Sequence, residues 1–471
     1  MGSLGSHHFP VIVIGGGPVG FVTAINIARN GVKVAVLEKG PRIDQSPRAT
    51  SYQPCVLAEM QECGILEDVT RKAVVNNILS FWVGEGPEKK RVAYVEKLEG
   101  GKNFPAGLNC GQPVLTETVM HHLLNNYDAD VCFNQQVEDV YQDSTLVTVL
   151  CKDPTTDKVT RYTCDYLVGA DGAGSMVREC LGIEFEGFSW PKEDFCASNI
   201  RYPFDKYGFT TANFVLHDVH WGVITVIDDT GLWRCAFGIK PGMTNEQVRE
   251  ELDEHYKYIL PGWPGEGYEL VQLNRYKPHQ RCAKQYRKGR CFLAGDAAHS
   301  NNPIGGLGLT TGILDAGPLG RGLAAVVKGE APESILDKWA EARRHKWLTY
   351  TNEFSIENKR MVQRGGYSPD PAGIWKKDEV SRAHGMDKWI EKATASKEGE
   401  DLALFEQLKD RELQLQNRMK QWEITIDPLW MAEYEHPDIV KARMALRPEG
   451  LTPSSTTPLS SVTGVSIQPK E

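Results

Sequence analysis

The chain opens with a run of apolar, β-branched residues, Val11–Ile14, which breaks abruptly into the glycine-rich segment 15–20. Apolar positions with helical spacing follow at 24–28. The apolar run predicts a buried strand, the glycines predict a tight turn, and the spacing that follows predicts a helix. Strand, turn and helix around Gly-x-Gly-x-x-Gly are typical of the opening of a dinucleotide-binding domain.

Three glycines and one acidic residue give this motif its chemistry. Gly15 allows a sharp turn, Gly17 leaves room for a pyrophosphate at the helix N-terminus, and Gly20 lets the helix pack closely on the strand. The predicted second strand, 31–37, ends at Glu38, eighteen residues after Gly20. A carboxylate at this place accepts hydrogen bonds from the hydroxyls of a ribose. The spacing therefore predicts a nucleotide site.

Two later strands end in a similar way. The apolar segment 165–170 leads to Asp171, and the segment 290–295 leads to Asp296. A second glycine-rich loop, 303–312, then precedes a predicted helix, whose positive N-terminus would stabilise negative charge above the loop. Because open α/β sheets bind ligands at the carboxyl ends of their strands, we expect both carboxylates to face one nucleotide cleft.

Residues 190–275 have a different pattern, in which short apolar segments alternate with turns. We expect strands there at 195–202, 213–217, 221–227 and 232–239. This succession predicts an antiparallel sheet inserted between nucleotide-binding parts, followed by a helix at 245–259. From 332 onward the chain is helix-rich and charged, with a long helical pattern at 402–422, and residues after 448 have the Ser, Thr and Pro content typical of disorder.

Composition narrows the class of protein. With 471 residues, 41% hydrophobic and 24% charged, the chain has the profile of a globular protein large enough for two packed domains. It has no apolar run of the eighteen or so residues that span a bilayer, and no basic region followed by an apolar core at its N-terminus. We therefore expect a cytoplasmic protein without a membrane span. The eleven scattered cysteines predict reduced thiols and no metal site, and a net charge of −9 without a Lys/Arg block argues against a nucleic acid partner.

Three nucleotide motifs in this order, with a sheet between the second and third, resemble the class A flavoprotein monooxygenases, the p-hydroxybenzoate hydroxylase family. The matching pieces are Gly15–Gly20 with Glu38, the Asp171 segment, and Asp296 with its glycine-rich loop; they span about residues 9–327. The resemblance implies an α/β fold, namely a Rossmann-like FAD-binding domain with an inserted antiparallel-sheet substrate domain and a helical C-terminal region.

These motifs also suggest where the parts of the chain begin and end. We expect the first part of the FAD-binding domain at 9–185, the substrate-binding sheet domain at 186–275, the second part of the FAD-binding domain at 276–330, a helical C-terminal region at 331–447 and a disordered tail at 448–471. The chain has no second complete Gly-x-Gly-x-x-Gly unit, which suits a family without a separate nicotinamide domain.

The resemblance implies a tightly but non-covalently bound FAD. It assigns the adenosine ribose to Glu38, the ribityl and phosphate region to Arg48 and Gln112, the ribityl hydroxyls to Asp296, and amide contacts with the isoalloxazine to Gly308–Leu309. The complete set that it implies is Gly15, Gly17, Pro18, Val19, Gly20, Glu38, Arg48, Gln112, Asp171, Asp296, Pro303, Gly308 and Leu309.

The reaction implied by the resemblance is monooxygenation. NADPH or NADH reduces the FAD, O2 adds to give a flavin C4a-hydroperoxide, and an electron-rich aromatic or secondary-metabolite-like small molecule is hydroxylated or epoxidised. The Asp171 segment would contact FAD and nicotinamide, and Pro303 would lie beside the reacting edge of the flavin. The family often has Gln and Asn where this chain has Leu307 and Thr310, which leaves some polar contacts to the backbone.

Candidates for handling the substrate come from the pattern of the inserted sheet. His217 and His220 lie at or beside a predicted hairpin, and Arg234 lies on the next strand, where a base or a phenolate partner would be useful. The alternative is that the histidines are exposed turn residues and Arg234 is a charge on the sheet surface. Trp221 and Pro303 are the candidates for the wall of the substrate pocket. Catalytic residues are otherwise not identified by the sequence.

Other functions stay open at this point. An FAD-dependent oxidase or reductase shares the fold, and a flavin-binding interaction protein without turnover would retain the same motifs. The charged helices after residue 332 would either pack over the FAD-binding domain or form a homodimer.

Overall fold

Two sheets of different kinds organise the structure, a computed structural model that describes residues 7–46, 48–96, 107–190, 193–217 and 219–363. The predicted helix at 402–422 and the predicted disordered tail after 448 lie outside the described residues.

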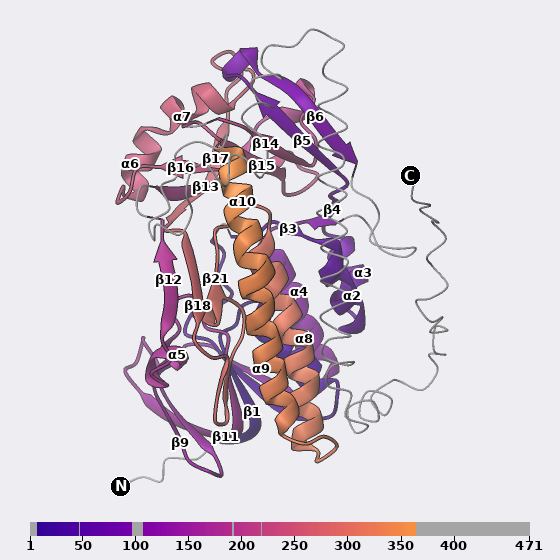
Figure 1. Ribbon diagram of the computed structural model, residues 1–471, viewed down its shortest axis with the longest axis vertical. Coiled ribbons are helices and arrows are strands. Elements are labelled where there is room, and N and C mark those ends of the chain that lie inside the picture. The colour runs from indigo at the N-terminus through magenta and orange to yellow at the C-terminus, as the bar shows by residue number, and fades with distance from the viewer. Residues whose placement is uncertain (1–6, 47, 97–106, 191–192, 218, 364–471) are drawn as a thin grey trace, which may run out of the picture.

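The first sheet has parallel strands at its centre and occupies the lower half of the view in Figure 1. In order, it contains β19 (Arg287–Lys288), β20 (Cys291–Leu293), β11 (Val159–Gly169), β1 (His7–Ile14), β2 (Val34–Leu37) and β8 (Ala129–Cys132), and β10 (Val147–Lys152) and β9 (Gln136–Gln142) continue from β11. Pairing is parallel from β20 to β8 and antiparallel elsewhere. The predicted strand Val11–Ile14 is buried throughout, as expected of a central strand in a parallel sheet that is covered on both faces.

Six of the described helices belong to the same half of the molecule as this sheet. They are α1 (Pro18–Ala28), α2 (Pro54–Glu62), α3 (Leu66–Thr70), α4 (Gln112–Asn126), α5 (Met176–Cys180) and α8 (Leu307–Val327). Helix α8 lies directly against α1, and a Cβ added at Gly320 would stand 2.7 Å from the Thr23 carbonyl oxygen of α1. The glycine therefore permits the close approach of the helix that follows the second glycine-rich loop to the helix that follows the first.

The second sheet lies in the upper half of Figure 1 and includes the predicted inserted strands. Its order is β17 (Glu269–Tyr276), β13 (Asp194–Arg201), β16 (Leu232–Ile239), β15 (Gly222–Val226), β14 (Ala212–Val215), β5 (Ile78–Val83) and β6 (Lys90–Glu96). Two of these strands, β5 and β6, come from outside segment 186–275, and the β5 and β14 pair is parallel, whereas the other neighbours are antiparallel. The predicted helix at 245–259 is divided into α6 (Asn245–Glu250) and α7 (Leu252–Ile259), which contribute to the apolar cluster on one face of this sheet.

Short elements connect the two large sheets. One small sheet contains β12 (Phe185–Ser189), β18 (His279–Ala283) and β21 (His299–Ser300), and another contains β3 (Ser51–Tyr52), β7 (Leu108–Asn109) and β4 (Val74–Val75). The 3-10 turns are Gly86–Glu88, Phe204–Tyr207 and Gly295–Ala297.

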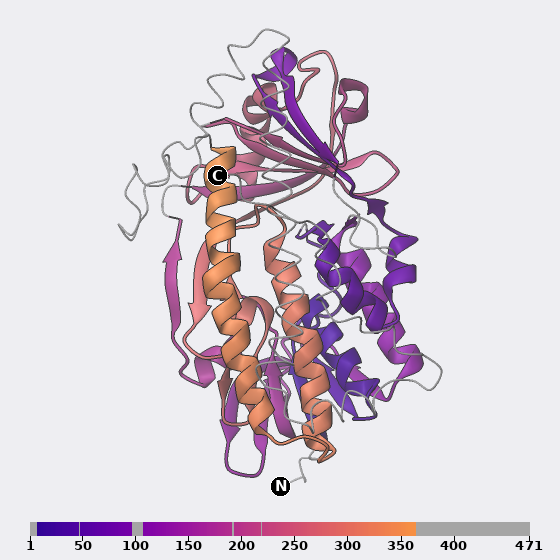
Figure 2. The same ribbon diagram turned by 45° about the vertical axis from the view of Figure 1, so that its right-hand side comes forward.

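A helical rod ends the described chain. It consists of α9 (Ser334–Lys346), a π-helical turn (Trp347–Thr351) and α10 (Asn352–Val362). Figure 2 shows this orange rod running beside the first sheet and reaching the second with its C-terminal end. The helical character predicted after 331 is thus present as far as the structure describes it.

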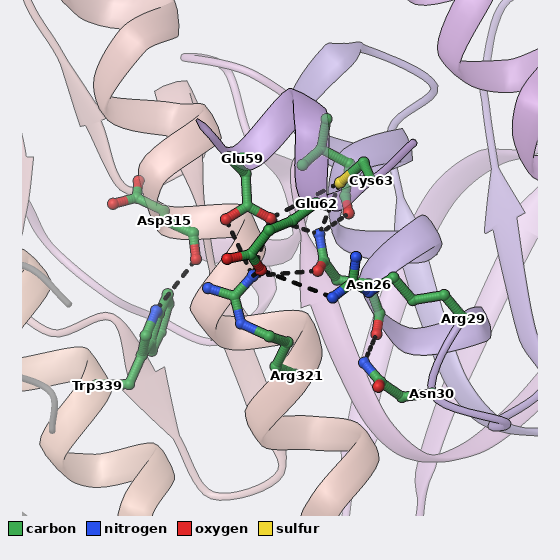
Figure 3. A network of polar contacts seen from close by, with 10 residues as sticks. Asn26, Arg29, Asn30, Glu59, Glu62, Cys63, Asp315, Arg321 and Trp339 are labelled. Atoms are coloured by element: carbon green, nitrogen blue, oxygen red, sulfur yellow. Dashed lines mark hydrogen bonds and ion pairs between the residues drawn. The ribbon is translucent and has the colours of Figure 1, made fainter. Parts of the chain in front are cut away.

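A buried polar network holds α1, α2 and α8 together (Figure 3). Glu59 of α2 accepts hydrogen bonds from Asn26 of α1 (2.9 Å) and from Arg321 of α8 (3.0 Å). Arg321 also contacts Glu62 at 3.1 Å. A Cβ at Gly317 would stand 2.2 Å from the Glu59 carboxylate, so the absence of a side chain there lets the acid reach the surface of α8.

Replacing the arginine of this network should destabilise the protein strongly. The variant Arg321→Met leaves the Glu59 carboxylate, which is 8% exposed, without its cationic partner, and removal of one partner of a buried ion pair costs about 3–5 kcal/mol of unfolding free energy. The double variant Arg321→Met/Glu59→Gln should regain most of this loss. Urea unfolding measures both, with Lys284→Met of an exposed ion pair as the control; equal stability of Arg321→Met and wild type would contradict the role of the network.

Candidate functional site

The carboxyl ends of four parallel strands meet at one edge of the first sheet. Ile14, which ends β1, pairs with Leu37 of β2 and Gly169 of β11, and Gly169 pairs with Leu293 of β20. The chain continues from these four ends to Gly15, Glu38, Asp171 and Asp296. Strand register alone therefore brings the three predicted nucleotide motifs together.

The first glycine turn has space only on one side. Gly15 has a φ of 108°, and a Cβ there would stand 2.4 Å from the carbonyl oxygen of Ala170. A Cβ on Gly20 would stand 2.0 Å from the carbonyl oxygen of Gly15, whereas one on Gly17 would meet no described atom within 4 Å. Gly17 is the N-cap of α1 and has no side chain to occupy the positive end of the helix. The turn is therefore closed toward the protein and open where a pyrophosphate would bind.

Glu38 is fixed in position by the backbone. Its carboxylate accepts hydrogen bonds from the amides of Gly16 (2.7 Å) and Gly40 (2.8 Å). The side chain is half-buried. An ionised carboxylate has about four lone-pair sites, so two amide bonds leave acceptor capacity for a ribose diol.

Asp296 lies where two of the predicted cofactor segments come close. Its side chain is exposed, although Gly295 and Ala297 on either side are buried. Desolvation by surrounding protein raises the pKa of the Asp296 carboxyl, and the charges of His299 and Arg48 partly offset this. A carboxyl that is closely surrounded yet still accessible suits a ligand contact.

The start of α8 lies beside this carboxyl. A Cβ on Gly308 would stand 4.0 Å from Asp296 Oδ1. Gly306, with a φ of 68°, is the N-cap of the helix, and Thr310 turns its hydroxyl back to the Gly306 carbonyl oxygen at 2.7 Å. Leu309 is half-buried. The first turn of α8 thus offers backbone amides and the positive end of the helix dipole instead of polar side chains.

Asn301 is a residue of this region that the sequence did not single out. Among the described residues, its Oδ1 atom is buried and accepts no hydrogen bond. A Cβ on Gly308 would stand 3.8 Å from that oxygen. A buried acceptor costs free energy unless it is satisfied, so its place beside Gly308 and Asp296 fits a site for a ligand with hydroxyl groups. Only its position after a strand and before the glycine-rich loop hints at this in the sequence.

Arg48 and Gln112 lie on neighbouring backbone segments. The amide of Gln112, the first residue of α4, donates to the carbonyl oxygen of Ala49 at 3.1 Å. The Arg48 side chain is 55% exposed and pairs with Asp44 at 2.9 Å. The influence of Arg48 on the pKa of Asp296 places its charge near that carboxyl.

Asp171 has a structural task in addition to any ligand contact. Its carboxylate accepts hydrogen bonds from the Ser175 hydroxyl (2.5 Å) and the Val177 amide (3.2 Å), which hold the start of α5. Burial raises the pKa of the Asp171 carboxyl, and these hydrogen bonds counteract the increase. A Cβ on Gly15 would stand 3.0 Å from the Asp171 Cα atom, so this segment borders the first glycine turn. Pro18 and Val19 begin α1 on the other side of that turn.

A buried cluster of Asp315, His299 and Arg343 holds the Gly295 turn in place. Asp315 of α8 contacts His299 at 2.5 Å and Arg343 at 2.6 Å, and it accepts a hydrogen bond from the Gly295 amide at 3.1 Å. Burial alone would raise the pKa of the Asp315 carboxyl, but His299 and Arg343 outweigh it and hold that pKa below its usual value. The turn that carries Asp296 is therefore tied to α8 and α9.

One face of the second sheet meets the second glycine-rich loop. Ile304 belongs to the same apolar cluster as residues of that face. The aromatic members are Phe81, Phe195, Phe214, Trp221 and, at its edge, Tyr276. Trp221, a predicted pocket residue, is fully buried, whereas Pro303, the other one, is exposed.

Arg234 is a charged residue of this face. It is 7% exposed, so the alternative of a charge on the sheet surface is wrong. Its Nε atom donates to Asn199 Oδ1 at 2.7 Å, and its Nη1 atom donates to the Arg48 carbonyl oxygen. Burial lowers the pKa of Arg234 to about 10, while the hydroxyl of Tyr276 opposes the decrease. The guanidinium therefore keeps its charge at neutral pH.

The two histidine candidates belong to the end of the β14 and β15 hairpin. The His217 ring contacts Glu85 at 3.0 Å and accepts from the His220 amide at 2.8 Å. The His220 ring stacks on Tyr258 of α7 at 3.6 Å. Burial, followed by the charge of His217, lowers the pKa of His220. These contacts connect the hairpin turn to α7 and to the segment between β5 and β6.

Comparisons with known proteins assign the chain to a class. The model of a family described as "FAD binding domain" matches residues 8–352. Para-nitrophenol 4-monooxygenase of Pseudomonas sp. (strain WBC-3) is 36% identical over 81% of this chain and 93% of its own length. 6-hydroxy-3-succinoylpyridine 3-monooxygenase HspB of Pseudomonas putida (strain DSM 28022 / S16) is 34% identical over 81% of this chain and 95% of its own length.

Solved structures agree with this assignment. The crystal structure of p-nitrophenol 4-monooxygenase PnpA from Pseudomonas putida DLL-E4 matches 88% of this chain and 98% of that chain, with a TM-score of 0.75 and 33% identity. The flavin-dependent monooxygenase PieE, at 20% identity and a TM-score of 0.69 over 86% of this chain and 71% of that chain, shares the fold. The predicted Rossmann-like fold is confirmed. Within the described residues, no helix is long and apolar enough to cross a bilayer, and no group of His, Cys, Asp and Glu is placed to hold a metal ion.

Two glycine substitutions in the first turn should affect different properties, FAD affinity in one case and stability in the other. Gly17→Ala places a methyl group in open space, so the melting temperature of the apoprotein should not change, but the dissociation constant of FAD should rise by about tenfold, equivalent to about 1.4 kcal/mol. Gly20→Ala places its methyl group against the Gly15 carbonyl and should lower the melting temperature of the apoprotein. Thermal melting and FAD titration distinguish them; wild-type FAD affinity in Gly17→Ala would exclude the pyrophosphate from this turn.

Asp315→Asn should make stability less dependent on pH in the acidic range. A carboxyl with a lowered pKa stabilises the fold above its unfolded value of about 3.9, and this contribution is lost as pH falls below that value toward the folded pKa. Wild type should therefore exceed Asp315→Asn by about 3–5 kcal/mol of unfolding free energy at pH 6–8, since Arg343 loses its buried partner. The difference should shrink below about pH 4. Urea unfolding across pH measures it, and a gap that stays constant down to pH 3 would contradict the assignment.

Proposed function

Because the chain belongs to the family of FAD-dependent monooxygenases of aromatic compounds, we propose that it hydroxylates a small phenol-like ring that carries a second substituent opposite its hydroxyl. The predicted monooxygenase activity, with FAD, NAD(P)H and O2, is that of the family. Membership of this family favours a monooxygenase over the alternatives of an oxidase, a reductase or an interaction protein without turnover. Which residues bind the cofactor and the substrate is part of the proposal.

The observation that carries the proposed substrate class is the aromatic face of the second sheet with Arg234 on it. Apolar and aromatic side chains around a buried cation suit a flat ring with one anionic oxygen. A second buried cation at this face, Lys359, is paired with Glu193, so Arg234 is the one we assign to the substrate. Two further polar side chains, Asn199 and Thr225, point to the same face because they pair with Arg234 across the strands. The substrate ring would lie between this face and the loop at Ile304, which joins the same apolar cluster.

The names of two relatives describe similar molecules. Para-nitrophenol and 6-hydroxy-3-succinoylpyridine each have a hydroxyl and a second substituent on opposite carbons of a six-membered aromatic ring. The oxidised positions in these names, 4 and 3, are the carbons that carry the second substituent. For this chain we propose the same relation between hydroxyl, substituent and oxidised carbon.

The residues of the site have separate tasks in this proposal. FAD, once reduced by NAD(P)H and combined with O2, supplies an electrophilic oxygen atom. The cofactor would be bound and oriented by Gly17, Glu38, Asp296 and the first turn of α8. The sheet face and Ile304 would exclude water from the substrate ring. Arg234 would stabilise the phenolate form, whose charge makes the opposite carbon more nucleophilic. We favour Arg234 over His217 and His220 for substrate contact because the histidines connect the hairpin to α7 and to the segment between β5 and β6.

Electrons and atoms balance for a nitro substituent. The carbon opposite the phenolate forms a bond to the transferred hydroxyl oxygen, and the carbon–nitrogen bond then breaks with its electron pair, so that nitrite leaves. The added hydroxyl loses its proton, and both ring oxygens become the carbonyls of a quinone. Nitrite release is therefore a direct signature of the proposed position of oxidation.

The test uses a panel of ring compounds and one arginine variant. Para-nitrophenol and other phenols with a substituent opposite the hydroxyl should stimulate NADPH or NADH oxidation, and para-nitrophenol should yield nitrite, whereas nitrobenzene, which lacks the hydroxyl, should do neither. Arg234→Met should raise KM for the phenol by about 10- to 100-fold, because a hydrogen bond to a charged group contributes about 1.5–3 kcal/mol.

The control for this variant is Arg201→Met, an exposed arginine that is 43% accessible on the neighbouring strand β13. It should retain the KM of wild type. Failure of every phenol of the panel to stimulate NAD(P)H oxidation by the FAD-loaded protein would overturn the substrate class, and an unchanged KM in Arg234→Met would overturn the role of Arg234.

A further inference from the structure

Helix α10 lies beyond the part of the chain that the family model matches. The match ends at residue 352, and α10 spans Asn352–Val362. Figures 1 and 2 show this helix leaving the level of the first sheet and ending against the second. Its contacts divide into two polar groups, one toward the glycine-rich loop and one toward the aromatic sheet face.

The first group holds the loop that carries Pro303 and Ile304. Asn302 is fully buried and donates to the backbone carbonyl oxygen of Ser355 at 2.8 Å. Its own side-chain oxygen accepts a hydrogen bond from the Ile304 amide at 3.1 Å. The next contact along α10 is from Asn358 Nδ2 to the Ile304 carbonyl oxygen at 3.4 Å. Both polar groups of the Ile304 backbone are thus engaged by this group of side chains.

The second group holds the sheet face. Lys359 is 1% exposed, and its ammonium contacts Glu193 Oε2 and Gln363 Oε1, each at 2.6 Å. The other oxygen of Glu193 accepts a hydrogen bond from the indole of Trp221 at 2.8 Å. The ammonium also lies 4.6 Å from the ring centre of Trp190 and 5.9 Å from that of Trp221. A carboxylate and aromatic ring faces together compensate for burying this cation.

The last residue of the helix completes the link. The Val362 carbonyl oxygen accepts a hydrogen bond from the His217 amide at 3.0 Å, and the Val362 side chain joins Trp221 and Ile304 in one apolar cluster. Ser355 and Lys359 are four residues apart on a rigid helix, which corresponds to an axial distance of about 6 Å. One short helix is therefore bonded both to the loop beside the predicted cofactor site and to the wall of the predicted substrate site.

We propose that α10 sets the spacing between the Ile304 loop and the aromatic sheet face, and that Lys359 is a positioning residue which acts through Glu193 and Trp221. Oxygen transfer requires the ring to be held within a fraction of an ångström of the productive position. An apolar side chain in place of Lys359 would fill the same space without a directional bond to Glu193. The proposal rests on the proposed function only for the choice of a phenol as substrate.

The variant Lys359→Met tests the proposal in the FAD-loaded, full-length protein. Product formed per NADPH oxidised should fall by about tenfold or more, with hydrogen peroxide making up the difference, because a small displacement of the ring slows transfer steeply. The dissociation constant of FAD should stay within about twofold of wild type, because the contacts described for Lys359 are with the sheet face and not with the first glycine turn. The matched control is Lys206→Met, whose exposed ion pair with Glu266 follows the opposite end of β13 from Glu193, and it should remain fully coupled.

Hydrogen exchange gives a readout that does not depend on turnover. In the apoprotein, Lys359→Met should speed exchange in the peptides that contain His217 and Ile304, because both amides depend on α10 or on its contacts. The double variant Glu193→Gln/Lys359→Met removes the unpaired carboxylate, so it should fold even where the single variant does not, and it should stay uncoupled.

Wild-type coupling in either variant, or exchange in these two peptides that matches wild type, would overturn the role of α10. Loss of FAD binding by a folded variant would also overturn it, since the helix would then support the cofactor site as a whole. A wild-type protein that no phenol stimulates would overturn the proposed function instead, while the exchange experiment would still decide the role of α10.

Discussion

The parallel pairing of β20, β11, β1 and β2 is the constraint on which the rest of the structure depends. Because their last residues are register neighbours, the chain must continue from four ends at the same edge. The predicted nucleotide motifs begin there, from the open face at Gly17 to the accessible carboxyl of Asp296. A shift of one strand by a single residue would reverse its side chains and separate the motifs.

A second layer of contacts keeps these ends rigid. Asp315 connects the Gly295 turn to His299 and Arg343, and Glu59 connects α1 and α2 to Arg321 of α8. The carboxylates at the centre of both clusters are buried, so the loss of a cationic partner would leave an uncompensated buried charge. The contacts of Glu59 connect the helices that follow the two glycine-rich segments to each other.

Local signals in the sequence were enough to predict the cofactor side of the molecule. Gly15, Gly17, Gly20 and Glu38 follow from a spacing within thirty residues, and the fold expected from it is confirmed. The second sheet, which carries the proposed substrate face, is built from strands far apart in the sequence, and no local pattern shows which of them pair. Strands at 78–83 and 91–95 are visible as apolar segments, but their membership of the second sheet requires the parallel pairing of β5 with β14.

The same limit applies to individual side chains. Arg234 is buried because the chain at Arg48 covers it, and that contact joins residues 186 positions apart. Lys359 and Glu193 are 166 positions apart, and only the path of α9 and α10 brings them together. Asn301 has no distinctive spacing, and only the fold shows its unsatisfied oxygen beside Gly308.

A crystal structure of the protein with FAD and para-nitrophenol tests the central claim most directly. We predict the pyrophosphate at Gly17, a ribose on Glu38, and the phenol ring between Ile304 and the aromatic sheet face with its oxygen on Arg234. A ring bound away from this face, or an FAD whose pyrophosphate avoids the first glycine turn, would contradict it.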